Sequence, residues 1–172
     1  HNDAIRLFAK TLQNLEQWLV TGTPGRVLWA THASSFDGGS QQWQQLMWPL
    51  TDDGRVEGPA VDVTAWGGLL ALHTGLGAHW AVFASPLDGG SAYRLVRLAD
   101  DGTPSAVADL PATARPLLTT TDSRLFVAWQ DQGSGTIDYA FLTPAGATIL
   151  QAAFPRVCRT LTVAGRGDEV WL

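Results

Sequence analysis

Apolar residues near the start of the chain follow a helical spacing. Residues three and four apart lie on one face of an α-helix, and five apolar residues have these separations: Ile5, Phe8, Leu12, Leu15 and Leu19. The pattern predicts an N-terminal helix over residues 1–20. We expect its apolar face to cover either the rest of the domain or another protein.

From residue 18 onward the pattern changes to short alternating or apolar runs, separated by Gly, Pro, Asp and Ser. Such runs predict β-strands joined by turns. The chain contains no second long stretch with helical spacing. We therefore expect an all-β domain after the N-terminal helix.

Three segments share one plan: "GRVLWATHASSFDGGSQQWQQLMWPLTDDGRVEGPAVDV", "AHWAVFASPLDGGSAYRLVRLADDGTPSAVADLP" and "SRLFVAWQDQGSGTIDYAFLTPAGATILQAAFP". Each has an aliphatic strand ending near an aromatic residue, a Gly-rich turn, a long alternating strand, a second turn and a last short strand. One more short strand precedes each segment, which gives four antiparallel strands per repeat. The aligned aromatics recur every 42 to 54 residues at Trp29, Phe83, Trp129 and Trp171.

The second turn of each repeat closes with glycine, at Gly54, Gly102 and Gly146. Two of these glycines follow an aspartate, in Asp53-Gly54 and Asp101-Gly102, and hairpins need a positive φ that glycine adopts without a steric cost. A fourth copy begins at "TLTVAGRGDEVWL" and contains only its first hairpin. The recurring turns therefore mark the repeat.

Four antiparallel strands per repeat resemble the blades of a β-propeller, and the turns resemble those of broad bacterial propeller repeats. The resemblance covers residues 17–172. It implies a β-propeller-like fold of about three and a half four-stranded blades following the N-terminal α-helix. The expected blades span about 17–63, 68–112, 115–154 and, in part, 157–172.

The chain has 11 basic and 16 acidic residues, spread without blocks, and a net charge of -5. No basic stripe is present that could bind nucleic acid or an anionic membrane. The apolar runs are far shorter than the roughly 20 residues of a membrane helix. Since residue 1 is His rather than Met, we expect that a signal peptide, a tag or a longer precursor was removed, and the bacterial repeats favour a secreted or periplasmic location.

Repeated turn residues are the first candidate ligand site. Asp37, Asp88 and Asp131 occupy equivalent turns, where they could contact a sugar or calcium, or bond their own backbone. The stretch "SSFDGGSQQW" also resembles the Asp-box turn of sialidase propellers, although Trp43 falls one residue late. These four residues are the candidates for a carbohydrate-binding, lectin-like function.

Catalytic and metal sites are not expected. Tyr93 and Tyr139 lie mid-strand, where packing explains them, and the acids lie mainly in turns, so a sialidase-like glycosidase is the third alternative. His73 and His79 flank a short turn without a third ligand, and we expect both to be exposed. No phosphate-binding loop or nucleophile motif is present, and no cofactor is expected.

The partial fourth repeat suggests an assembly function. Propellers close with about four to eight blades, because an open ring leaves blade faces and strand edges uncovered. Another chain, the N-terminal helix or further sequence could cover them. We expect a non-catalytic module that binds another protein chain, as a homo- or hetero-oligomer, and whose interface includes Ile5, Phe8, Leu12, Leu15 and Trp171.

Overall fold

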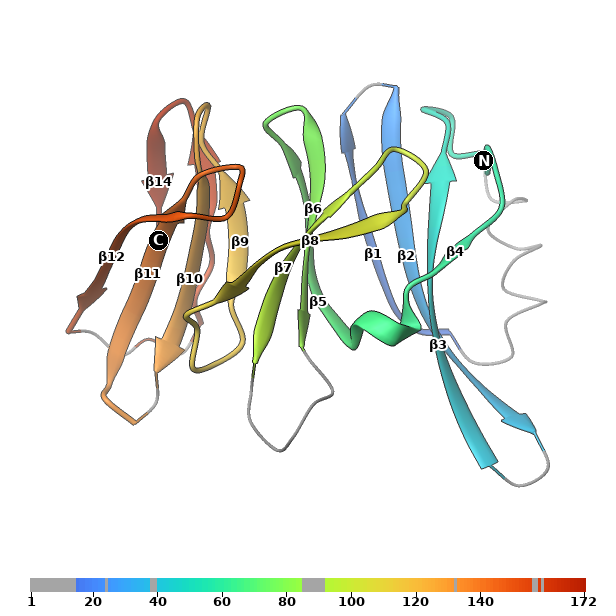
Figure 1. Ribbon diagram of the computed structural model, residues 1–172, viewed down its shortest axis with the longest axis horizontal. Coiled ribbons are helices and arrows are strands. Elements are labelled where there is room, and N and C mark those ends of the chain that lie inside the picture. The colour runs from blue at the N-terminus through green and yellow to red at the C-terminus, as the bar shows by residue number, and fades with distance from the viewer. Residues whose placement is uncertain are drawn as a thin grey trace.

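The computed structural model describes residues 15–23, 25–37, 40–84, 92–131, 133–155, 158 and 160–172. This part of the chain is all-β and contains no α-helix, only the short 3-10 helix η1 (Thr64–Trp66). It forms three four-stranded antiparallel sheets and one two-stranded sheet (Figure 1). The expected four-stranded antiparallel arrangement is therefore confirmed.

Within each sheet, consecutive strands are neighbours. Sheet 1 contains β1 (Leu15–Thr23), β2 (Arg26–Asp37), β3 (Ser40–Leu50) and β4 (Val61–Asp62). Sheet 2 contains β5 (Gly68–Gly75), β6 (Ala78–Ala84), β7 (Tyr93–Leu98) and β8 (Pro104–Leu110). Sheet 3 contains β9 (Leu117–Thr120), β10 (Leu125–Asp131), β11 (Thr136–Leu142) and β12 (Thr148–Phe154), and sheet 4 contains β13 (Ala164–Arg166) and β14 (Glu169–Trp171).

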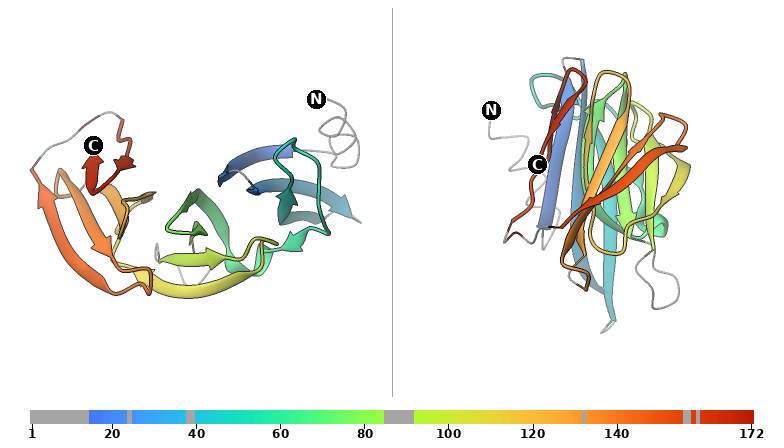
Figure 2. Two further views of the ribbon diagram at one scale, coloured as in Figure 1. Left: turned by 90° about the horizontal axis from the view of Figure 1, so that it is seen from above. Right: turned by 90° about the vertical axis from the view of Figure 1, so that its left-hand side faces the viewer.

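The four sheets lie side by side through their first strands. β1 contacts β5, β5 contacts β9, and β9 contacts β13. Seen from above, the sheets follow one another along an open arc, with sheet 1 at one end and sheet 4 at the other (Figure 2). The described residues do not close this arc into a ring.

The helix expected over residues 1–20 is wrong for residues 15–20, which belong to β1. Val20 pairs with Trp29 and Leu19 with Ala30, so this segment bonds along β2 in the manner of a strand. Pairing with β2, which has one irregularity between Leu15 and Gln17, bonds backbone groups of this segment and overrides the local helical spacing. The backbone of Leu15 pairs with Ala33, whereas Ile5, Phe8 and Leu12 lie outside the described residues.

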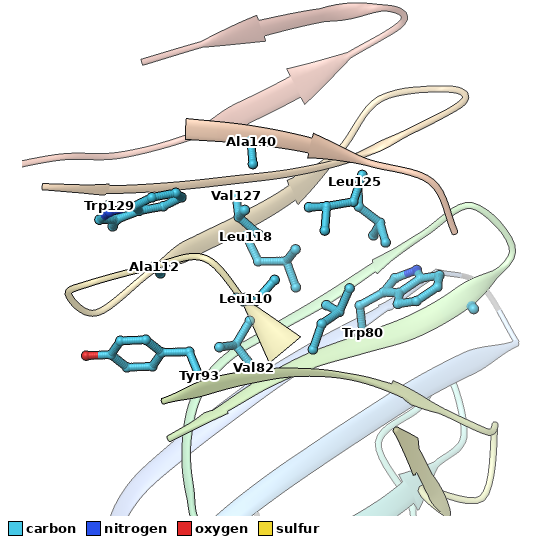
Figure 3. Packing of buried hydrophobic residues seen from close by; sticks show 13 residues of the cluster. Trp80, Val82, Tyr93, Leu110, Ala112, Leu118, Leu125, Val127, Trp129 and Ala140 are labelled. Carbon is cyan, nitrogen blue, oxygen red and sulfur yellow. The ribbon is translucent and has the colours of Figure 1, made fainter. Parts of the chain in front are cut away.

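Apolar side chains fill the space between neighbouring sheets. Between sheets 1 and 2 the core contains Leu28, Ala30, Met47, Val63, Ala81, Phe83, Val96 and Leu98. Between sheets 2 and 3 it includes Trp80, Val82, Leu95, Leu125, Val127, Trp129 and Leu142 (Figure 3). Because sheet 2 is covered on both faces, β6 is buried along almost its whole length.

The turns between the third and fourth strands use glycine as expected. Gly54, Gly102 and Gly146 have φ angles of 80°, 87° and 83°. A Cβ at Gly102 would lie 2.8 Å from the Cβ of Met47 in sheet 1, and one at Gly146 would lie 2.7 Å from the Cβ of Ala108 in sheet 2. The turns at Gly102 and Gly146 therefore pack on the preceding sheet, whereas no described residue lies within 4 Å of a Cβ at Gly54 in sheet 1.

Candidate functional site

The candidate sugar-binding residues do not form one site. Trp43 is 43% exposed on the β2–β3 hairpin, with its ring centroid 4.9 Å from that of His32. The backbone of Asp37 pairs with Ser40 on the same hairpin. Asp131 ends β10 in sheet 3, which is not a neighbour of sheet 1. Asp88 lies outside the described residues.

The Asp131 carboxylate is occupied by its own turn. Its Oδ1 accepts hydrogen bonds from the backbone N–H groups of Gly133 at 2.8 Å and Ser134 at 3.4 Å. These bonds hold the pKa of Asp131 below its usual range, and the bond from Gly133 has the largest effect. The geometry fits the turn-forming role that the sequence left open beside a ligand contact. Of the candidate sugar contacts, the Trp43 ring is then the side chain with surface available for stacking.

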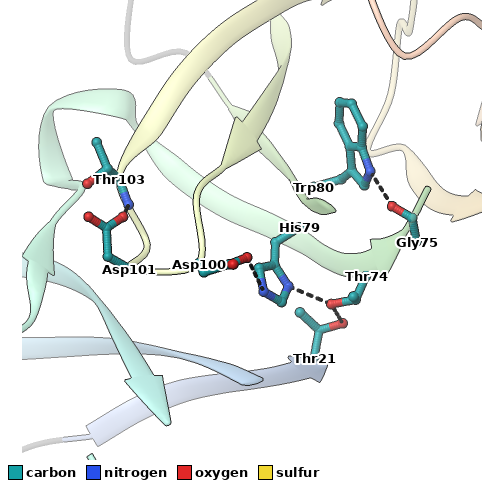
Figure 4. A network of polar contacts seen from close by, with 8 residues as sticks. All are labelled: Thr21, Thr74, Gly75, His79, Trp80, Asp100, Asp101 and Thr103. Atoms are coloured by element: carbon teal, nitrogen blue, oxygen red, sulfur yellow. Dashed lines mark hydrogen bonds and ion pairs between the residues drawn. The ribbon is translucent and has the colours of Figure 1, made fainter. Parts of the chain in front are cut away.

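The expectation that both hairpin histidines are exposed is wrong. His79 is 0% exposed and His73 is half-buried. A hydrogen bond of 2.7 Å joins His79 Nδ1 to the Thr74 hydroxyl, and His79 Nε2 lies 3.8 Å from Asp100 Oδ1 (Figure 4). Thr74 thus gives the buried ring of His79 a hydrogen-bond partner at Nδ1, and the turn between β7 and β8 places the Asp100 carboxylate near Nε2.

Polar contacts also join the first strands of neighbouring sheets. The hydroxyls of Thr21 in β1 and Thr74 in β5 lie 3.0 Å apart. His73 Nε2 in β5 lies 3.0 Å from the Thr120 hydroxyl in β9. These contacts connect sheet 1 to sheet 2 and sheet 2 to sheet 3. The two histidines bond different partners. The described residues contain no cluster of three or more His, Cys, Asp or Glu suited to a metal.

Burial lowers the pKa of His73 below its ordinary value. The folded protein therefore keeps this ring neutral at a pH where the unfolded chain binds a proton. Its contribution to stability is present above the unfolded pKa of about 6.5 and is lost as the pH falls below it. We expect the free energy of unfolding to decrease from pH 7 to pH 5, as measured by urea titration.

The His73→Gln variant separates this contribution from those of other groups. Gln keeps a polar side chain near Thr120 but does not titrate in this range. The decrease in unfolding free energy between pH 7 and pH 5 should be smaller in the variant than in the wild type. An equal decrease in both proteins would show that His73 does not cause it.

Sheet 3 carries an aromatic face on the side of sheet 4, formed by Phe126, Tyr139, Phe141 and Phe154. The ring centroids of Phe126 and Phe141 are 4.8 Å apart, and those of Tyr139 and Phe154 are 5.0 Å apart. Phe126 is 2% exposed, whereas Phe154 on the outer strand is 45% exposed. Sequence reasoning recognised these residues as strand positions but missed the shared face, because it depends on the register of three strands.

An apolar cavity of about 820 Å³ lies between the aromatic face and sheet 4. Its lining includes Ile137, Phe154, Leu161, Trp171 and Leu172. Trp171, an interface residue predicted from the sequence, is 49% exposed here. Exposed aromatic and aliphatic groups gathered around one hollow are typical of a binding surface.

At the Asp100 side of sheet 2, a second and open cavity of about 540 Å³ is lined by residues that include Arg97, Asp100 and Ser105. It does not contain the pairing of a nucleophile with a base that covalent catalysis requires. In the described part of the chain, no helix has the length and apolar character needed to cross a membrane.

The apolar end beside sheet 4 is therefore the strongest candidate site, and its residues suit binding better than chemistry. Comparison with known proteins adds no function to this geometry: no family model, no curated protein and no solved structure matches the chain.

Proposed function

We propose that this chain is a non-catalytic assembly module, an incomplete β-propeller that binds another protein chain at its open ends. The observation that carries the proposal is the repeated packing of sheet upon sheet. Each sheet contacts the next through its first strand, and the outer turns of sheets 2 and 3 pack on the preceding sheet. The same packing is available to a further chain at each end of the arc.

The sheet 1 end supports this proposal. Gly54 is equivalent to Gly102 and Gly146, yet no described residue lies within 4 Å of the position that its Cβ would take. Thr21 on β1 contacts sheet 2. Its neighbour Val20 therefore points to the opposite face of sheet 1, away from sheet 2, and is 54% exposed. An exposed apolar position at the end of a repeat array fits a surface that another chain covers.

The sheet 4 end supports it independently. Among the described residues that line the cavity there, three large apolar ones are about half exposed: Phe154 at 45%, Trp171 at 49% and Leu172 at 48%. They surround the apolar cavity described above. A partner that covered these groups would gain roughly 25 cal/mol of binding free energy for each Å² of apolar surface that it buried.

Light scattering over a range of protein concentrations tests the proposal. We expect the chain to self-associate, with a mass at least twice its 18.4 kDa. Val20→Asp and Trp171→Asp place a charge in the two ends and should shift the mass toward that of one chain. Ser105→Asp, on an exposed polar strand position of sheet 2, is the control. A wild-type mass of one chain at every concentration would contradict self-association.

A further inference from the structure

Sheet 4 is half as wide as the sheet on which it packs. In sheets 1, 2 and 3, the second strand pairs with a neighbour on both sides. In the described part of the chain, β14 pairs with β13 alone. One long edge of β14 therefore has no strand beside it, and such an edge is a template for strand addition.

The hairpin that forms sheet 4 is fixed on sheet 3 at its inner side. Gly165 approaches the Thr120 carbonyl so closely that no side chain would fit there. The backbone N–H of Asp122 donates to the Gly167 carbonyl at 2.8 Å, and the Ser123 hydroxyl donates to Asp168 at 3.3 Å. The free edge of β14 is thus held in a defined position relative to the aromatic face.

The register determines which backbone groups point outward. A two-residue turn closes the hairpin, with Arg166 opposite Glu169 and Gly165 opposite Val170. The pair next to such a turn exchanges hydrogen bonds, and the following pair does not. The N–H and C=O of Val170 are therefore directed away from β13, toward the free edge.

The surface beyond this edge is apolar. β13 contacts β9, so the outer part of the aromatic face, on β11 and β12, extends past the hairpin. Tyr139 and Phe141 are half-buried there, and Leu150 and Phe154 are 49% and 45% exposed. On the equivalent faces of sheets 1 and 2, the third strand of the next sheet supplies buried residues such as Val96 and Ala140.

We propose that the sheet 4 end binds a β-hairpin of a partner chain, an inference that rests on the proposed assembly function. The first strand of this hairpin pairs antiparallel with β14 through the N–H and C=O of Val170. Apolar side chains at every second position of both strands pack on Tyr139, Phe141, Leu150 and Phe154. Backbone bonds supply affinity, and the aromatic face selects the alternating apolar pattern.

A second copy of this chain does not provide the missing strands by pairing β14 with β14. That antiparallel pairing requires a two-fold axis normal to the sheet. Both copies of sheet 3 would then lie on the same side of the joined sheet and occupy the same space. In the proposed complex the hairpin therefore comes from a partner chain that has two strands free to add.

A synthetic peptide of residues 92–112 is a suitable probe, because it contains β7 and β8, the third and fourth strands of sheet 2. Its charged residues favour solubility, and a scrambled peptide is the control. We expect saturable binding in NMR titration and amide exchange at Val170 slowed by about tenfold or more. No saturation, or unchanged exchange at Val170, would overturn the proposal.

Two variants test the two parts of the surface separately. Val170→Pro removes the N–H that donates to the added strand. Phe154→Asp places a charge on the aromatic face and leaves β13 and β14 unchanged. The affinity for the peptide should be at least about tenfold lower in both variants than in Ser105→Asp. This is the loss expected when one strand hydrogen bond or one apolar contact is removed. Equal binding by all three variants would overturn the proposal.

These results are distinguishable from a failure of the proposed function. If the chain self-associates but does not bind the peptide, strand addition at β14 is rejected and assembly stands. If a chain that stays monomeric binds the peptide and protects Val170, strand addition stands and self-association is rejected.

Discussion

Trp80→Ala is expected to lower the free energy of unfolding by about 3–5 kcal/mol, the range for removing a buried Trp or Phe side chain. The Trp80 side chain is 1% exposed in the core between sheets 2 and 3. Its indole N–H donates to the Gly75 carbonyl at 2.9 Å. The substitution opens a cavity between two sheets. It also removes the hydrogen-bond donor to Gly75 in β5, the strand that contacts β9. Urea unfolding followed by circular dichroism measures the loss.

Trp43→Ala is the matched control, because it removes the same side chain from a position that is 43% exposed. Its effect should be smaller, about 1–2 kcal/mol, because a large part of the Trp43 ring is already in water. A loss at Trp43 as large as that at Trp80 would contradict the assignment of the core to the space between sheets.

Gly102→Ala is expected to destabilise the protein by about 2–5 kcal/mol. One part is the cost of a positive φ for a residue with a Cβ, roughly 1–2 kcal/mol. The other is crowding: the new Cβ would lie 2.8 Å from the Cβ of Met47, which is 0% exposed in the neighbouring sheet. Overpacking of this kind costs roughly 1–3 kcal/mol. Denaturant unfolding gives the sum.

Gly54→Ala isolates the second part. Gly54 lies in the equivalent turn with a φ of 80°, against 87° at Gly102, but a side chain there meets nothing within 4 Å. Only the backbone cost should appear, about 1–2 kcal/mol. Equal losses in the two variants would mean that the turn of sheet 2 does not pack on sheet 1.

The strands and turns were predictable because their signals are local. Alternation of apolar and polar residues follows from the strand period of two, and Asp101-Gly102 identifies a turn by the backbone conformation that it needs. The four-stranded antiparallel sheets follow from counting such runs within one repeat. These features do not depend on residues far away in the chain.

The incorrect predictions concern features that distant residues determine. Leu15 and Leu19 have helical spacing, but pairing with β2 determines their conformation. The environment of His79 depends on Asp100 in the turn between β7 and β8, and on the burial of β6 between sheets 1 and 3. The aromatic face similarly requires the registers of β10, β11 and β12, which side-chain periodicity does not provide.

The most direct test of the central claim, that whole sheets lie side by side through their first strands, is a disulfide between β1 and β5. The Thr21 and Thr74 hydroxyls lie 3.0 Å apart, so Thr21→Cys with Thr74→Cys, in a Cys158→Ser background, should crosslink on mild oxidation. Thr21→Cys with Thr120→Cys, which places the second thiol on β9, should not crosslink. The account predicts a disulfide in the first pair alone by mass spectrometry of the folded protein. No disulfide in the first pair, or equal crosslinking of both, would contradict it.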